Sequence, residues 1–120
     1  MIQRRIKQSS IENKPTRFFS KKQETDVAKK VSGKTTPNSG ATTFLPGDVI
    51  GDNVLYECKT KMKPSKTITI HKEWIEKNNR EALFSGKQYG VLVFNFGPNE
   101  KNYYVLDEDL FSEFLKYINN

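Results

Sequence analysis

The sequence predicts an α/β fold, and three observations support this prediction. Residues 47–59 contain two short apolar runs around a turn at residues 51–53, which is the pattern of an antiparallel hairpin. The segment before them, residues 20–33, has the apolar spacing of a helix. After the hairpin, strand-like and helix-like segments alternate to the C-terminus. At 120 residues, the chain is long enough for one domain with a modest core.

The first predicted helix begins at Ser20 and ends at Gly33. Ser20 can cap it, with Gln23 completing a capping box, and glycine is a natural helix stop. The apolar stripe consists of Val27, Ala28 and Val31. Glu24 falls on this stripe, where a carboxylate is costly unless it is paired or binds a metal. The alternative is that Glu24 lies in a partly exposed first turn, where it suits the helix dipole.

The hairpin carries the residues with the clearest chemistry. Glu57 and Lys59 are two residues apart and therefore share a face, and pairing of the two runs would place Asp48 beside Glu57. Two carboxylates and one ammonium would then converge. Hard divalent cations such as magnesium prefer these oxygens, and phosphodiester cleavage uses such a metal together with a cation. Cys58, the single cysteine, is expected to face the core and cannot form an internal disulfide.

The segment between helix and hairpin, GKTTPNSGATTFLPGD, is rich in Gly, Ser, Thr and Pro and is expected to be a loop. Its start is not a phosphate-binding loop, because the glycine required five residues before Gly33 is Ala28.

The segments after the hairpin complete the predicted fold. In chain order, we expect a third strand from Lys66 to His71, a helix from about Lys72 to Phe84, a buried fourth strand over residues 88–97, a fifth strand from Asn102 to Leu106 and a last helix capped by Asp107. The last helix carries a continuous apolar stripe, interpreted as core: Leu110, Phe111, Phe114, Leu115 and Ile118. His71, the only histidine, is expected to be a polar surface residue rather than a proton shuttle.

The spacing of Asp48, eight residues and then Glu57-Cys58-Lys59 resembles the active-site signature of the PD-(D/E)XK nuclease superfamily, and the small Holliday-junction resolvases of archaea and phages are most similar. The resemblance covers most of the chain. It implies a restriction-endonuclease-like core, a mixed sheet with an antiparallel hairpin flanked by helices in αβββαβ order. It also implies that Asp48, Glu57 and the Cys58 backbone carbonyl hold Mg²⁺, for which Mn²⁺ can substitute. Glu24 would complete the site directly or through water, and Lys59 would orient the attacking water or stabilise the pentavalent phosphate.

The sequence departs from the family pattern at two positions. Gly47 stands before Asp48, where the family usually has proline, and Lys72-Glu73-Trp74 stands where many members carry a glutamine. The resolvases also have a serine-glycine loop that reaches the DNA backbone, and residues 38–42 resemble it. The residues expected to contact DNA are Arg4, Arg5, Lys34, Ser39, Thr42, Lys61, Lys63, Lys66 and Lys72.

Charge is unevenly distributed along the chain. Residues 1–22 carry seven Lys/Arg and one acid, so they hold a charge equal to the net +6 of the whole chain. We interpret residues 1–17 as a basic arm that contacts DNA, the alternative being a solubilising tail, and residues 18–120 as a single nuclease domain. No apolar run approaches the roughly 20 residues of a membrane span, and the N-terminus lacks a signal peptide's apolar segment. We therefore expect a cytoplasmic protein without a membrane partner or small-molecule cofactor.

These observations predict a magnesium-dependent endonuclease that hydrolyses DNA phosphodiester bonds, with a Holliday junction or other branched or nicked DNA as substrate. Two symmetric cuts call for a homodimer, and the last helix could make that contact instead of core. A first alternative is a phage or mobile-element nickase or sequence-specific endonuclease on the same fold. A second is a non-catalytic DNA-binding accessory protein. An RNA-binding module is disfavoured because the aromatic residues lie in core-like runs.

Overall fold

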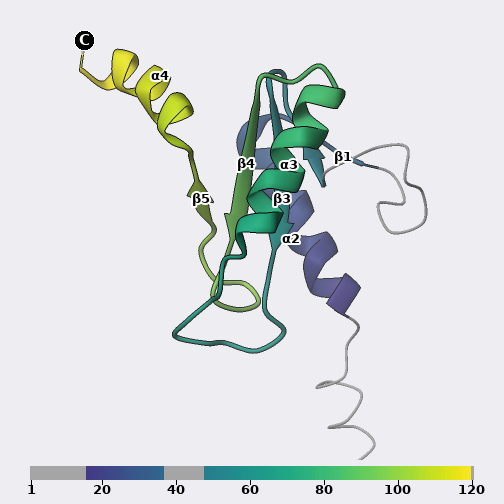
Figure 1. Ribbon diagram of the computed structural model, residues 1–120. Helices are drawn as coiled ribbons and strands as arrows, with labels where there is room; N and C mark the ends of the chain where they lie inside the picture. Colours follow the sequence, from purple (N-terminus) through teal and green to yellow (C-terminus); the bar gives the residue numbers. More distant parts are fainter. Residues whose placement is uncertain (1–15, 37–47, 120) are drawn as a thin grey trace, which may run out of the picture.

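The computed structural model describes residues 16–36 and 48–119 (Figure 1). Within them it forms a five-stranded mixed sheet and three helices. In chain order these elements are α2 (Thr16–Val31), β1 (Lys34–Thr35), β2 (Val49–Ile50), β3 (Val54–Lys59), α3 (Lys72–Phe84), β4 (Tyr89–Phe94), β5 (Tyr103–Val105) and α4 (Glu108–Ile118). No helix of the described residues combines the length and apolar character needed to cross a bilayer.

The strands follow one another in space as they do in sequence, in the order β1-β2-β3-β4-β5. The pairs β1–β2, β2–β3 and β4–β5 are antiparallel, and β3–β4 is parallel. A parallel pair needs a long crossover, and α3 provides it. Figure 1 shows α3 and α2 on opposite sides of the sheet. The sheet is therefore covered on both faces at β3, where the candidate site lies.

Alternation along β3 explains which side chains each helix covers. Tyr56 and Cys58 point to the face on which Val27 of α2 packs with Val91 and Val93. Leu55, Glu57 and Lys59 point to the opposite face, under α3. The predicted apolar stripe of the first helix is confirmed, because Val27 is fully buried and Ala28 and Val31 pack against the same cluster. The buried Cys58 side chain is likewise confirmed.

Helix α3 is fixed to the sheet by a buried amide and a close backbone approach. Asn78 donates hydrogen bonds from Nδ2 to the carbonyls of Leu55 and Val91, at 3.1 and 3.3 Å, and so links the helix to both parallel strands. Gly90 of β4 permits the contact. A Cβ there would lie 2.6 Å from Asn79 Oδ1 and 3.0 Å from Asn78 Nδ2.

The start of the first helix differs from the prediction. Helix α2 begins at Thr16, so Ser20 lies inside it and is not its cap, and the expected boundary after residue 17 falls within the helix. Pro15 precedes the helix in sequence, and proline favours helix starts because its φ is already helical. Gln23 is buried and hydrogen-bonds to other elements, so it does not complete a capping box.

The predicted strand from Lys66 to His71 is wrong, because this segment has no strand pairing. The Ser65 hydroxyl accepts from Thr67 N at 3.2 Å and donates to Thr67 O at 2.9 Å. Such local bonds compete with a sheet ladder. The loop prediction for residues after Gly33 missed β1, whose extension pairs Thr36 N with Asp48 O at 3.1 Å. The element order αβββαβ is present, but its three consecutive strands are β1, β2 and β3. The prediction had instead used the segment from Lys66 to His71 as the third strand.

The C-terminal elements match the predicted order. Strands β4 and β5 and helix α4 lie where they are expected, and the Asp107 side chain caps α4 by accepting from Leu110 N at 2.9 Å. The interpretation of the α4 stripe as core is wrong, since no residue of α4 is buried. Leu110 is the stripe residue that packs against the core cluster.

Candidate functional site

Asp48 and Glu57 meet at the end of the β2–β3 pair. Val49 pairs with Tyr56, which places Asp48 opposite Glu57, and Asp48 N donates to Tyr56 O at 2.9 Å. The Asp48 carboxylate then accepts from Cys58 N at 2.7 Å. The Asp48 carboxylate therefore accepts a hydrogen bond that a backbone carbonyl of the neighbouring strand would otherwise accept. This bond fixes the carboxylate against β3. The convergence predicted from the sequence is confirmed for these two carboxylates.

Lys59 is held beside Glu57 by two contacts. Its Nζ lies 3.5 Å from Glu57 Oε2 and 4.4 Å from the centroid of the Trp74 ring. Trp74 belongs to the first turns of α3, and its ring centroid is 4.6 Å from that of the exposed His71. An ion pair and a cation–π contact together restrict the ammonium group to the carboxylate side of the sheet.

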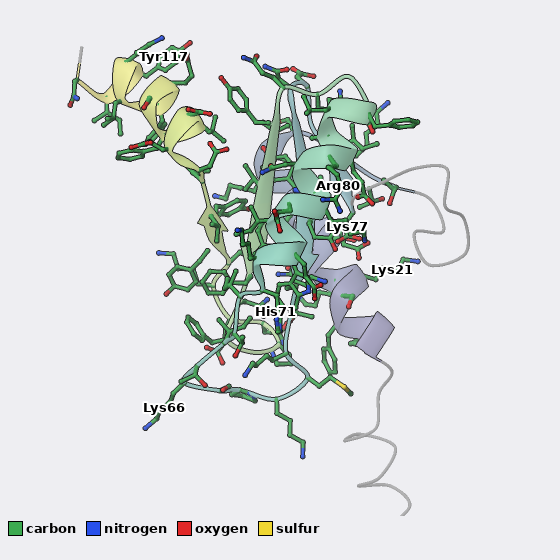
Figure 2. The ribbon with its side chains drawn as sticks, in the orientation of Figure 1. Lys21, Lys66, His71, Lys77, Arg80 and Tyr117 are labelled. Atoms are coloured by element: carbon green, nitrogen blue, oxygen red, sulfur yellow. The ribbon has the colours of Figure 1, made fainter. Side chains whose placement is uncertain are left out.

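Helix α3 adds two charged residues that the sequence reasoning missed, Lys77 and Glu81. Lys77 Nζ lies 3.7 Å from Glu81 Oε1, and Figure 2 shows Lys77 projecting from the side of α3. Glu81 Oε2 is buried and has no hydrogen-bond partner among residues 16–36 and 48–119. The spacing of Trp74, Lys77 and Glu81, at i, i+3 and i+7, places them on one helix face. This spacing was the available sequence signal, but the contact of that face with β3 depends on tertiary packing.

The negative charges of Asp48 and Glu57 are not fully balanced by the positive charges around them. Burial is the main cause that raises the pKa of Glu57, and the charge of Asp48 is the second. Burial also raises the pKa of Asp48, opposed next by the Cys58 N–H bond. Lys59 and Lys77 lower both pKa values, and Glu81 raises both. Because the net shift is upward, the charged pair would gain from a bound cation.

The donor chemistry of this pair fits Mg²⁺. Magnesium is commonly held by one or two carboxylates and retains several waters. Asp48 and Glu57 supply the carboxylates, and the Cys58 carbonyl belongs to the same strand end. Among residues 16–36 and 48–119, no three or more His, Cys, Asp or Glu side chains group closely enough to hold a metal together. The fit therefore rests on two carboxylates.

Glu24 lies in the middle of α2 and is half-buried. The alternative of a first-turn position is wrong, because the helix begins eight residues earlier. The Glu24 charge contributes to the raised pKa of the Cys58 thiol, after burial and Asp48. The structure thus brings Glu24 toward β3 from the α2 face, whereas the charged groups that shift the pKa of Asp48 and Glu57, apart from Asp48 itself, lie on β3 and α3.

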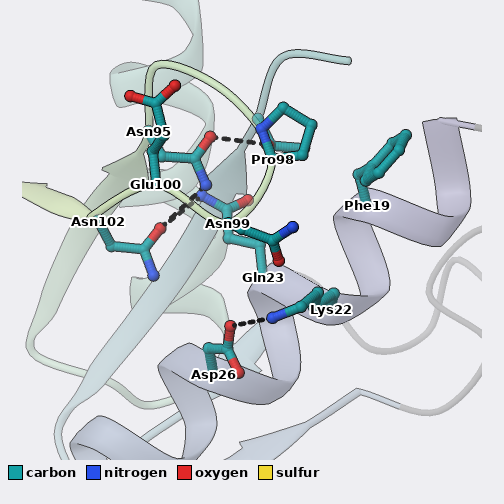
Figure 3. A pocket seen from close by; sticks show the side chains of 10 residues that line it. Phe19, Lys22, Gln23, Asp26, Asn95, Pro98, Asn99, Glu100 and Asn102 are labelled. Carbon is teal, nitrogen blue, oxygen red and sulfur yellow. Dashed lines mark hydrogen bonds and ion pairs between the residues drawn. The ribbon is translucent and has the colours of Figure 1, made fainter. Parts of the chain in front are cut away.

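A partly buried network of side-chain amides, which was not predicted from the sequence, holds the C-terminal end of β3. Gln23 Nε2 donates to the Lys59 carbonyl at 2.9 Å and to Asn102 Oδ1 at 3.2 Å. Asn95 Nδ2 also donates to Asn102 Oδ1, at 3.3 Å, and Thr60 Oγ1 donates to Asn95 Oδ1 at 2.7 Å. Figure 3 shows these amides around a polar pocket of about 100 Å³. The network fixes the backbone that carries Lys59.

The expected DNA-contacting residues are partly placed. Lys34 is exposed on β1, and Lys63, Lys66 and Lys72 are exposed between β3 and the start of α3, with Lys66 at the tip of the loop in Figure 2. Lys61 is half-buried and donates to Ser65 Oγ at 3.2 Å. The other expected contacts lie outside the described residues: Arg4, Arg5, Ser39 and Thr42.

Comparisons with known proteins add no relative. No protein-family model matches the chain, and searches of curated proteins and of solved structures find no significant similarity.

Proposed function

We propose that the protein is a magnesium-dependent DNA endonuclease with a restriction-endonuclease-like core. The observation that carries this proposal is the pairing of Asp48 and Glu57 across β2 and β3, in a desolvated site next to Lys59. Buried like charges are expensive to maintain without a function or a cation. The sequence spacing of these three residues and the αβββαβ order of the elements further support it.

Each residue of the site has a role in hydrolysis of a phosphodiester. Asp48 and Glu57, with the Cys58 carbonyl, would bind Mg²⁺, and Glu24 would act on it from α2 through water. The bound ion supplies Lewis-acid activation of the phosphate and a water of lowered pKa. Lys59 would orient that water or offset the charge of the pentavalent phosphate, and Trp74 holds its ammonium in place. The products would carry 5′-phosphate and 3′-hydroxyl ends.

The arrangement of basic residues supports DNA as the substrate. Lys63, Lys66 and Lys72 are exposed on the segment that follows Lys59 of the site, where they could contact a phosphate backbone. The N-terminal arm would add further phosphate contacts through Arg4 and Arg5. Branched DNA is the proposed substrate, cut symmetrically by a homodimer in the cytoplasm.

Cleavage assays in magnesium and in EDTA test the proposal. The substrates are a labelled four-way junction, a nicked duplex, a linear duplex and supercoiled plasmid. Paired symmetric cuts in the junction alone would establish a resolvase, and Mn²⁺ should replace Mg²⁺. Nicking of duplex or plasmid with junctions intact would assign the same site to a nickase or sequence-specific endonuclease.

Variants separate chemistry from folding. Glu57→Gln and Lys59→Ala should reduce cleavage at least about 100-fold while DNA binding in EDTA remains. Glu73→Gln is the matched control, because Glu73 is an exposed carboxylate in the first turn of α3. Metal-dependent cutting that survives in Glu57→Gln would contradict the assignment of the site. Binding without cutting of any substrate by the wild type would favour the DNA-binding accessory protein.

A further inference from the structure

Phe94, Phe96 and Tyr103 form an aromatic cluster on β4, β5 and the connection between them. The rings of Phe94 and Tyr103 are stacked, with their centroids 5.6 Å apart and their planes 21° apart. Phe96 meets both rings edge-on, with centroid distances of 5.5 and 5.7 Å. Tyr103 is 45% exposed, and it lies on β5, the last strand of the described sheet. The side of its ring away from Phe94 is therefore open to solvent.

The register of the sheet places this aromatic cluster on the same face as the candidate site. Lys59 pairs with Phe94, and Phe94 pairs with Tyr103. Paired residues of neighbouring strands project from the same side of a sheet, so these three side chains form one row across β3, β4 and β5. Neighbouring strands are about 4.8 Å apart, so two spacings put the Tyr103 backbone roughly 10 Å from that of Lys59. The row leads from the candidate catalytic lysine to the exposed ring.

The contacts of Asn102 confirm which way the start of β5 faces. Its side chain accepts a hydrogen bond from Gln23 of α2 at 3.2 Å, so Asn102 points to the α2 face. Alternation then places Lys101 and Tyr103 on the opposite face, which is the face of the candidate site. Lys101 is exposed. Glu100, the acidic residue of the same connection, lines the polar pocket on the α2 side instead.

The basic segment after β3 lies beside the aromatic cluster. Ser65 N donates to the Phe96 carbonyl at 2.7 Å, and this bond fixes the segment against the connection between β4 and β5. Figure 1 shows both connections at the same end of the sheet. Lys63 and Lys66, on either side of Ser65, are exposed. With Lys101, they give this end of the sheet a positive charge that favours a polyanion over an apolar protein segment.

We propose that the aromatic cluster binds an unpaired DNA base, which stacks on the open side of the Tyr103 ring while the neighbouring phosphates contact the lysines. Every base has an aromatic face, and an exposed aromatic ring beside positive charge binds single strands without sequence preference. The bases of an intact duplex are stacked on each other and do not reach the ring. The inference rests on the proposed endonuclease function, and it names unpaired bases near the scissile phosphate as the substrate feature that this protein selects.

Fluorescence anisotropy of the full-length chain in EDTA measures the base contact without cleavage. The probes are a labelled oligodeoxythymidylate of about 12 nucleotides, within the usual size of a single-strand site, and a strand of equal length made of abasic residues. The two strands carry the same phosphates, so the difference in affinity reports the bases alone. The wild type should bind the strand with bases at least about fivefold more tightly, which is the lower end of what stacking of one base contributes.

Variants of Tyr103 assign this preference to the ring. Tyr103→Leu fills space against Phe94 without an aromatic face, so it should lose at least about fivefold in affinity for the strand with bases and nothing for the abasic strand. Tyr103→Trp should keep the preference. Phe84→Leu is the matched control, because Phe84 is 91% exposed at the C-terminal end of α3, at the other end of the sheet (Figure 1). Unchanged far-UV circular dichroism will show that each variant is folded.

Three results would overturn the stacking site. The first is equal affinity of the wild type for the strand with bases and the abasic strand. The second is a folded Tyr103→Leu variant with the wild-type preference. The third is a tighter, Tyr103-dependent binding of a ribonucleotide strand of the same base, which would transfer the site to RNA. Because these assays contain no metal, they are independent of cleavage: a base preference that depends on Tyr103 would stand even if the protein cut no DNA, and only the endonuclease proposal would then fail.

Discussion

Asp48 and Glu57 are both held by the fold in a state that favours their protonated forms. Their ordinary pKa values are 3.8 and 4.5, and burial raises both. The folded protein therefore binds protons more tightly than the unfolded chain above these values. Without a cation, the stability of the fold should fall as the pH rises from about 4 through the raised pKa values. When both are charged, the two carboxylates destabilise the fold, and a bound metal ion would offset this cost.

Thermal unfolding at several pH values measures this coupling. Excess magnesium should raise the melting temperature at pH 8, by several degrees if its concentration is about a hundredfold above Kd. The shift should vanish near pH 4, where protons replace the ion. In EDTA at pH 8, Glu57→Gln should melt higher than the wild type because it lacks the desolvated charge, and magnesium should no longer stabilise it. A magnesium shift that persists in this variant would place the ion elsewhere.

Glu81 gives a second prediction at the scale of single residues. Its charge raises the pKa of both Asp48 and Glu57, so Glu81→Gln should move the acidic limb of the cleavage rate to lower pH. At neutral pH the rate should change less than about tenfold, because Glu81 acts through the other carboxylates. Glu73→Gln, on the same helix, should leave the pH profile in place. Loss of all cleavage in folded Glu81→Gln would instead make Glu81 a direct ligand.

The candidate site was predictable where its residues are close in sequence. Asp48, Glu57 and Lys59 follow from strand alternation and hairpin pairing, which are local rules. Glu81 and Gln23 could not be assigned in the same way, because their roles arise from the packing of α3 and α2 against β3. A helix face can be identified from spacing alone, but the strand it will contact cannot.

At the scale of elements, the parallel pair β3–β4 depends on how closely α3 approaches it. Asn78 can bridge Leu55 and Val91 because Gly90 has no side chain. The periodic helices and the buried strand β4 were predictable, since their apolar spacing is strong. The segment from Lys66 to His71 has equally regular alternation but is not a strand. The Ser65 hydroxyl makes local hydrogen bonds with Thr67 instead, and the segment does not pair with any strand of the described sheet.

Substitution of Gly90 tests this packing. Gly90→Ala should destabilise the fold by about 1–3 kcal/mol, because the new Cβ would lie 3.0 Å from Asn78 Nδ2, which is held in place by its bonds to the Leu55 and Val91 carbonyls. Gly51→Ala is a suitable comparison, since its closest neighbour would be a Tyr56 ring carbon at 3.2 Å, on a side chain that can shift. Urea unfolding should give the larger loss for Gly90→Ala. Equal losses at both positions would mean that the approach of α3 is not tight.

At the scale of the whole molecule, charge and apolar surface are separated. Basic residues are concentrated before residue 23 and after β3, whereas the acidic helix α4 lies at the opposite end of the sheet from the basic loop (Figure 1). The uneven charge was readable from the sequence, because it depends on composition alone. The exposure of the α4 stripe was not, since an amphipathic helix has the same pattern whether it packs within its own chain or against a second one.

The separation of basic and acidic regions can be tested most directly at the basic N-terminal arm. Since α2 begins at Thr16, a deletion of residues 1–15 removes Arg4, Arg5, Lys7 and Lys14 while leaving the helix intact. Each phosphate contact contributes about 0.9 to the slope of log K against log salt, so four contacts would lower the slope by between roughly three and four. Fluorescence anisotropy with a junction in EDTA measures this slope without cleavage.

A full-length variant with these four residues changed to glutamine separates charge from chain length. If the arm binds phosphates, this variant and the deletion should lose the same slope and the same affinity at low salt. If the arm contributes through its other residues, the glutamine variant should retain the affinity that the deletion loses. An unchanged slope in both variants would remove the arm from DNA binding and leave Lys63, Lys66 and Lys72 as the main phosphate contacts.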